Sequence, residues 1–175
     1  SSNTSNTIFG KSCWNNSSNN ASDYNTIFGE GVMGTGAVAA AARNTGMGYN
    51  ALQDITSGSK NTSLGAVSMT QMTEGENNVA IGFQALYSAT TQDECIAIGK
   101  DALFGLNHDD ADGSIGIGYL AGTGQTSGIG NVAIGSSALT ANVDGDFSTA
   151  VGTSALTAQT GTAGTVGNTA VGYQS

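Results

Sequence analysis

The sequence predicts an all-β fold: a β-solenoid (a β-roll or β-helix) of about ten coils, built as one repeat domain over residues 1–175. Three observations support this prediction. A pentapeptide that ends in glycine recurs ten times, most often at a spacing of 17 residues. Each copy alternates large and small residues with the period of a strand. A unit of 17 residues is too short for a helix pair and matches one coil of a solenoid.

The repeats cover nearly the whole chain, and they are numbered 1 to 10 by the glycine that closes each one. The closing glycines are Gly10, Gly29, Gly48, Gly65, Gly82, Gly99, Gly118, Gly135, Gly152 and Gly172. Five of the nine intervals between them are 17 residues, and the others are longer by two or three. A glycine at one fixed place indicates a positive φ or a close approach to neighbouring backbone. We expect a tight corner there.

The residues before each closing glycine form the expected strands. The residue just before the glycine is always large and apolar, and the third residue before it is always β-branched, as in Val79-Ala80-Ile81. A small residue stands between them in most copies. We expect the bulky side chains in the core. The small-residue face, as at Ala133 and Ala150, is expected to pack against another chain, because small side chains let a second backbone approach.

The segment after each closing glycine supplies the rest of the expected core. Three and four positions later most copies have Ala-Leu, as in Ala85-Leu86, and polar residues then lead to the next strand. The alanine-rich segment 36–43 is interpreted as a loop or a small-residue strand, with one helical turn as the alternative. About three large side chains per coil contribute roughly 5–8 kcal/mol, against an ordering cost of roughly 1–2 kcal/mol per residue. This thin margin favours a homo-oligomer, most simply a trimer.

An asparagine column precedes the strands. Its members are Asn6, Asn25, Asn44, Asn61, Asn78, Asn131 and Asn168, with Cys95, Ser114 and Ser148 in the other copies. Equivalent amides in stacked coils can form a hydrogen-bonded ladder. The alternative is that asparagine merely tolerates the turn conformation before a strand.

The composition excludes two classes of partner. Thirteen acidic and four basic residues leave a net charge of −9, which is unsuited to binding a phosphate backbone, so we expect no nucleic acid. No apolar run approaches the roughly 20 residues that cross a bilayer, so we expect no membrane insertion.

The unit N-[TV]-A-[IV]-G-x-x-A-L, seen in NVAIG at 78–82 and 131–135, resembles the head repeats of trimeric autotransporter adhesins and the shaft repeats of bacteriophage tail fibres. NTAVGYQ at 168–174 is especially similar to tail-fibre-like proteins. The resemblance implies a trimeric left-handed β-roll with a threadlike shape and adhesive duty. It also implies an extracellular, cell-surface or virion location.

We therefore expect a non-enzymatic structural fibre segment that mediates adhesion or binds a cell-surface glycan or protein receptor. The alternative is a subunit of an extracellular filament whose solenoids stack end to end. A fibre-borne polysaccharide hydrolase ranks third.

Residues that could carry chemistry are few. His108 lies in an insertion between two repeats, where a solvated loop is the default. The stretch 108–113 partly matches a calcium loop, with Asp109, Asp110 and Asp112 as candidate ligands. A solvated acidic turn is the alternative, and apart from this calcium ion we expect no cofactor.

Aromatic residues and cysteines complete the candidates. Tyr119 and Tyr173 each follow a closing glycine and are candidates for carbohydrate contact if that position faces outward. Isolated surface or interface aromatics are the alternative. Cys13 and Cys95 occupy different corners of repeats four to five layers apart, so we expect no disulfide between them, since a bridge needs Cα atoms within about 7 Å.

Overall fold

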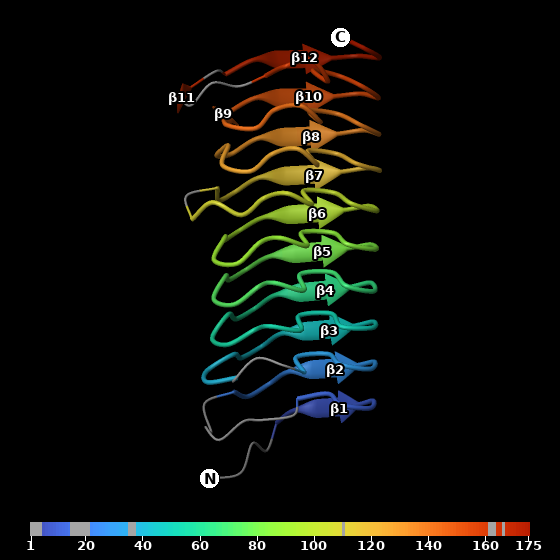
Figure 1. Ribbon diagram of the computed structural model, residues 1–175, viewed down its shortest axis with the longest axis vertical. Coiled ribbons are helices and arrows are strands. Elements are labelled where there is room, and N and C mark those ends of the chain that lie inside the picture. The colour runs from blue at the N-terminus through green and yellow to red at the C-terminus, as the bar shows by residue number, and fades with distance from the viewer. Residues whose placement is uncertain (1–4, 15–21, 35–37, 110, 161–163, 166) are drawn as a thin grey trace.

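A computed structural model describes residues 5–14, 22–34, 38–109, 111–160, 164–165 and 167–175. Within them, ten short strands form one parallel sheet in sequence order (Figure 1). They are β1 (Thr7–Phe9), β2 (Thr26–Phe28), β3 (Thr45–Met47), β4 (Thr62–Leu64), β5 (Val79–Ile81), β6 (Ile96–Ile98), β7 (Ile115–Ile117), β8 (Val132–Ile134), β10 (Thr149–Val151) and β12 (Thr169–Val171). A two-stranded sheet pairs β9 (Gly145–Asp146) with β11 (Gly164–Thr165).

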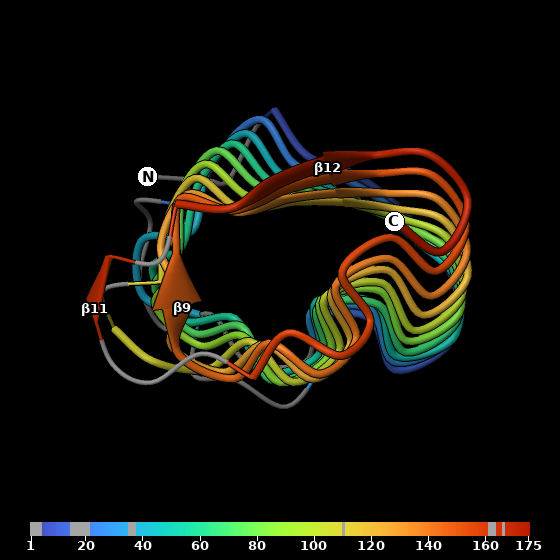
Figure 2. The ribbon, with the colours of Figure 1, turned by 90° about the horizontal axis from the view of Figure 1, so that it is seen from above.

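The chain forms a parallel β-solenoid of about nine turns, and its described residues contain no helix. Each strand pairs with the equivalent strand of the next repeat without a shift in register, as Val79 with Ile96 and Ile81 with Ile98. Seen along the axis, the coils overlie one another as a ring that bends inward after a tight turn (Figure 2). The all-β solenoid expected from the 17-residue spacing is therefore confirmed.

The closing glycines form the corner at the end of each strand. Their φ angles lie between 130° and 147°, a region that side chains rarely adopt. A Cβ on Gly82 would lie 2.6 Å from the carbonyl oxygen of Gly99 in the next repeat. Both expected reasons for glycine thus hold at this corner, namely the backbone conformation and the close approach of stacked coils.

Further left-handed residues bend the chain after each corner. Counting from the closing glycine (G), most residues at positions G+2 and G+4 have φ near +50 to +60°, including Val67, Leu52 and Leu86. A non-glycine residue rarely adopts such a φ, and a β-branched one is a genuine outlier. Burial of the G+4 side chain inside the ring stabilises this conformation: Leu52 and Leu86 are fully buried.

The small strand residues point into the ring, which corrects the expectation that this face packs between chains. Ala80, Ala97, Ala133 and Ala150 are at most 1% exposed. A Cβ on the equivalent Gly46 would meet the side chains of Val32 and Leu52. From β3 onward the middle strand residue is small because the G+4 leucine or methionine already fills the interior opposite it. In β2 this inward position holds the larger Ile27, which is 1% exposed.

The bulky strand residues therefore point outward, which is the second correction. Ile81 is 36% exposed, and Phe28 is 50% exposed. The core consists instead of the small strand column, the residues at G+3 and G+4, and an apolar residue at G+7. Alternation along a strand predicts two faces but cannot say which face is inside when both are apolar or small.

The described part of the alanine-rich segment, residues 38–43, contains no helix, in agreement with the loop interpretation. Val38 and Ala41 are buried, while Ala39 and Ala40 are exposed and share the carbonyl of Thr56 as acceptor for their N–H groups. The segment thus follows the wall of the solenoid like the other return segments.

Candidate functional site

The outer face of the ten-stranded sheet is an extended surface of apolar side chains and threonines. Each strand contributes two outward side chains, and these twenty include no charged residue. They are Thr7, Phe9, Thr26, Phe28, Thr45, Met47, Thr62, Leu64, Val79, Ile81, Ile96, Ile98, Ile115, Ile117, Val132, Ile134, Thr149, Val151, Thr169 and Val171. All of them are exposed or half-buried. We call this surface the sheet face.

Because the strands pair in register, equivalent side chains of successive repeats lie next to one another along the sheet face. The Phe9 and Phe28 rings stack with centroids 5.0 Å apart and an interplanar angle of 11°. In the middle repeats, isoleucines and valines pair with one another across neighbouring strands. The result is a flat, uncharged stripe that runs from β1 to β12.

The asparagine column forms a ladder within the wall. The Oδ1 atom of Asn61 accepts the backbone N–H of Asn78 at 2.9 Å, and its Nδ2 donates to the carbonyl of Gly75 at 2.7 Å. Asn131 repeats this arrangement with the N–H of Ser148 and the carbonyl of Gly145. Each amide therefore joins its own repeat to the next one, mainly through backbone groups. Asn168, in the last repeat, is exposed, and its Nδ2 donates to Gln159.

A serine in the asparagine column is accompanied by a buried glutamine, which the sequence analysis missed. The Nε2 atom of Gln125 donates to Ser114 Oγ at 2.7 Å and to the carbonyl of Gly128 at 2.5 Å. Gly128 is the acceptor that an asparagine at position 114 would use, by analogy with Asn61 and Gly75. Gln159 likewise donates to Ser148 Oγ at 2.9 Å. The signal was a glutamine at G+7, eleven residues after each serine.

The candidate calcium ligands make separate contacts. Asp109 Oδ1 accepts from Thr91 Oγ1 at 2.9 Å, and Asp112 Oδ1 accepts the N–H of Asp93 at 2.8 Å. Asp110 lies outside the described residues. No group of three His, Cys, Asp or Glu side chains suited to a metal ion occurs in the part of the chain that the structure describes. Calcium at this loop stays a prediction.

His108 and the two tyrosines lie on the surface. His108 is exposed, and its carbonyl accepts a hydrogen bond from Gln92 Nε2 at 2.8 Å. Tyr119 is 50% exposed beneath the Lys100 ammonium group, which lies 5.4 Å from the ring centroid. Tyr173 is 73% exposed. The two tyrosines belong to repeats 7 and 10, so they do not form a contiguous pair.

Both cysteine thiols are free. Strands β2 to β5 separate the strands of their repeats. Cys95 is fully buried, and burial raises the pKa of its thiol to about 12, although N–H groups of Ser114 and Gly113 partly offset this effect. Cys95 is therefore protonated and unreactive at neutral pH.

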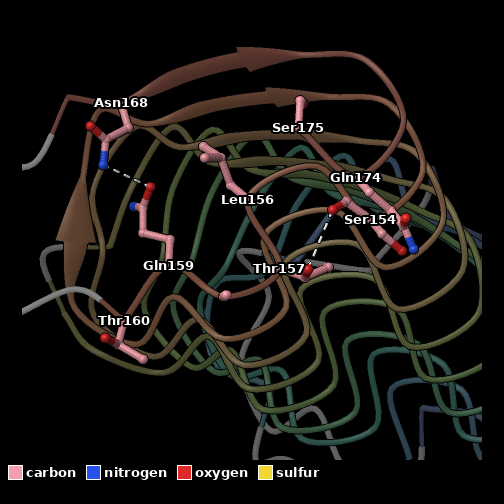
Figure 3. Close-up of a pocket in the computed structure, with 9 residues that line it drawn as sticks. Ser154, Leu156, Thr157, Gln159, Thr160, Asn168, Gln174 and Ser175 are labelled. Atoms are coloured by element: carbon pink, nitrogen blue, oxygen red, sulfur yellow. Dashed lines mark hydrogen bonds between the residues drawn. The ribbon is translucent and has the colours of Figure 1, made fainter.

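Three hollows lie on the surface of the solenoid. One of them, about 470 Å³, lies at the C-terminal end, where Leu156 and Gln159 border it (Figure 3). The other two, of about 320 Å³ and 300 Å³, lie along the side of the solenoid. Both are lined by residues at G+2 and G+5, so they fall on one line parallel to the axis.

None of the described segments forms a helix with the length and apolarity needed to cross a membrane. Comparison with family models, curated proteins and solved structures found no match for this chain.

Proposed function

We propose that this protein is a structural, non-enzymatic fibre segment that self-associates through the sheet face and carries an adhesive or receptor-binding surface. The observation that supports the proposal is the sheet face itself, with twenty outward positions and no charge among them. Soluble monomers rarely expose a contiguous apolar patch of more than a few hundred Å², and larger patches mark interaction sites.

The packing inside the ring explains why this surface needs a partner. The interior opposite each strand is already filled, because Leu86 and Leu103 pack there and leave room only for small residues such as Ala97. The bulky isoleucines cannot turn inward without overpacking the core. The remaining way to remove these isoleucines from water is to pack the sheet face against a second copy of the chain.

We propose a trimer as the closed assembly of this face. Three parallel copies around a threefold axis would each direct the sheet face toward the axis and form one apolar interior. Closed cyclic symmetry leaves no free sheet face, whereas an open arrangement would continue to grow. The resemblance of the repeats to those of trimeric adhesins and tail fibres also favours three chains. The same resemblance is the basis for proposing an extracellular, adhesive role.

The proposal is tested by the molar mass of the protein in sedimentation equilibrium. We expect three chains for the natural sequence at micromolar concentration. The double variant Leu64→Glu/Ile81→Glu adds two charges to the sheet face and should give a monomer with an unchanged far-UV circular dichroism spectrum.

A matched control places the same two charges on the opposite wall of the same repeats, as Gln71→Glu/Ser88→Glu. These positions lie six residues after Gly65 and Gly82. The control should keep the mass of the natural protein. A natural protein that is a monomer would contradict the proposal, and a mass that rises continuously with concentration would favour the end-to-end filament.

A further inference from the structure

The two lateral hollows define a groove along one side of the solenoid, away from the small-residue interior. The hollow over repeats 5 to 7 is the more apolar part, and we call it the axial groove. It is lined by Gln84, Asp101, Phe104, Leu120 and Thr123. The hollow over repeats 1 to 3 is lined at the same two repeat positions by small or polar residues such as Ser12, Gly31 and Gln53, and at G+1 by Glu30 and Tyr49.

Phe104 forms one wall of the axial groove. Its ring stacks on the ring of Tyr87, which is also at G+5 but does not line the groove, with centroids 5.1 Å apart and an interplanar angle of 5°. Each ring is only half-buried, and Leu120 at G+2 of the next repeat adds a second apolar side chain. Stacking holds the two rings in fixed positions, so the wall is preorganised for a flat apolar partner.

A carboxylate forms the facing wall. The side chain of Asp101 is only 16% exposed, and its Oδ2 atom lies 3.1 Å from the Lys100 ammonium nitrogen. Its Oδ1 atom is enclosed and has no hydrogen-bond partner among the described residues. A buried acceptor without a partner costs about 1–3 kcal/mol. Thr123 Oγ1 is committed to the carbonyl of Asp101 at 2.6 Å and fixes this wall.

From these walls we propose that the axial groove binds a neutral carbohydrate. A pyranose ring has an apolar face of C–H groups, which suits Phe104, and an edge of hydroxyl donors, which suits the Gln84 amide and the Oδ2 side of the Asp101 carboxylate. The carboxylate and the net charge of −9 disfavour sulfated, phosphorylated or carboxylated glycans. This inference deepens the proposed receptor-binding role and rests on it.

Saturation-transfer NMR and titration calorimetry test the site with four neutral tetrasaccharides, composed of β-linked glucose, N-acetylglucosamine, galactose or mannose. We expect at least one probe to bind saturably with a dissociation constant of about 0.1–10 mM. Phe104→Ala should weaken that binding about tenfold or more, because a central apolar anchor is lost. Asp101→Asn keeps the shape of the side chain, removes its charge and should weaken binding as well.

Phe147→Ala is the matched control, since Phe147 is 55% exposed and does not line the axial groove, and it should bind as the natural protein does. Binding by none of the four probes would overturn the inference. Equal affinity of Phe104→Ala and the natural protein would overturn it too, as would equal binding of a tetra-alanine peptide. Sedimentation of the same variants keeps the two proposals apart: both groove variants should retain the oligomer, whatever their affinity for sugar.

Discussion

The serine–glutamine pair of repeat 7 makes a quantitative prediction about how the wall is held together. In most repeats an asparagine donates to the carbonyl that lies three residues before the next member of the column, as Asn61 does to Gly75. In repeat 7, Ser114 and Gln125 share this task at the carbonyl of Gly128. The pair should therefore be replaceable as a unit, but not one residue at a time.

Each single substitution has a physical cost. Ser114→Asn alone places a second amide beside Gln125 at the carbonyl of Gly128. In repeat 8 one carbonyl accepts from two asparagines, Asn131 and Asn142. Because glutamine is one methylene longer than asparagine, we expect overpacking that costs about 1–3 kcal/mol. Gln125→Leu alone leaves the carbonyl of Gly128 with only Ser114 Oγ at 3.3 Å. Part of that loss is offset because the enclosed Gln125 Oε1, which has no partner among the described residues, is removed. We expect a net loss of about 0–1.5 kcal/mol.

The double variant Ser114→Asn/Gln125→Leu recreates the arrangement of repeats 3 and 4, where a buried asparagine is followed eleven residues later by the apolar side chain of Ile55 or Met72. We expect the free energy of unfolding of the double variant to be at most about 0.5 kcal/mol below that of the natural protein. The coupling energy between positions 114 and 125 would then be about 1–3 kcal/mol.

The assay is urea unfolding followed by circular dichroism for the four proteins of the cycle at one protein concentration, since self-association shifts the midpoint. In thermal melts, about 1 kcal/mol corresponds to roughly 2–4 °C for a chain of this length. If the changes in unfolding free energy of the two single variants sum to that of the double variant within about 0.5 kcal/mol, that result would contradict the shared role of Ser114 and Gln125.

Three further predictions follow from single residues. Gly82→Ala should destabilise the protein by more than about 3 kcal/mol, because an unfavourable φ and a backbone clash coincide. Gly113→Ala should cost only about 1 kcal/mol, because a Cβ at that position meets nothing within 4 Å. Equal urea midpoints for the two variants would contradict this prediction. Val67→Asn should stabilise the fold by about 0.5–1 kcal/mol, because asparagine tolerates the φ of 53° better than a β-branched residue. A melting temperature below that of the natural protein would refute the idea that the backbone of Val67 is strained. Cys95 should resist iodoacetamide at pH 8 until urea unfolds the chain. Its folded pKa of about 12 exceeds the ordinary thiol value of 9.0, so the unfolded chain loses its proton first. The contribution of the thiol to stability should therefore fall as pH rises from 9 toward 12. A Cys95→Ala variant with the same pH dependence would show that other groups cause the fall.

The repeat spacing was sufficient to predict the solenoid, the parallel register and the glycine corner. Each of these follows from backbone geometry, which is the same in every copy. Gly82 illustrates the point, because its place in the period already implied the close contact with Gly99 that the structure contains.

The direction of the strand faces was not predictable in the same way. Ala97 and Ile98 are both compatible with a core, and only the volume that the G+4 leucine occupies inside the ring decides which one points inward. The axial groove was missed for a related reason. Asp101 and Phe104 lie in one repeat, but Gln84 and Leu120 come from the repeats on either side, and the sequence does not show which side chains the inward bend of the coil brings together.

The central claim is that each repeat forms one coil and that successive coils are stacked in register. Pulsed electron paramagnetic resonance tests it on spin labels at position G+1, introduced by Lys11→Cys with Lys100→Cys, and by Lys11→Cys with Thr153→Cys. The background would carry Cys13→Ala and Cys95→Asn, and dilution with unlabelled protein would suppress distances between chains. The labels lie five and eight repeats apart, so at about 4.8 Å per coil we expect separations of about 24 Å and about 38 Å. Two distances that are equal, or that do not increase with the number of repeats between the labels, would contradict the stacked-coil account.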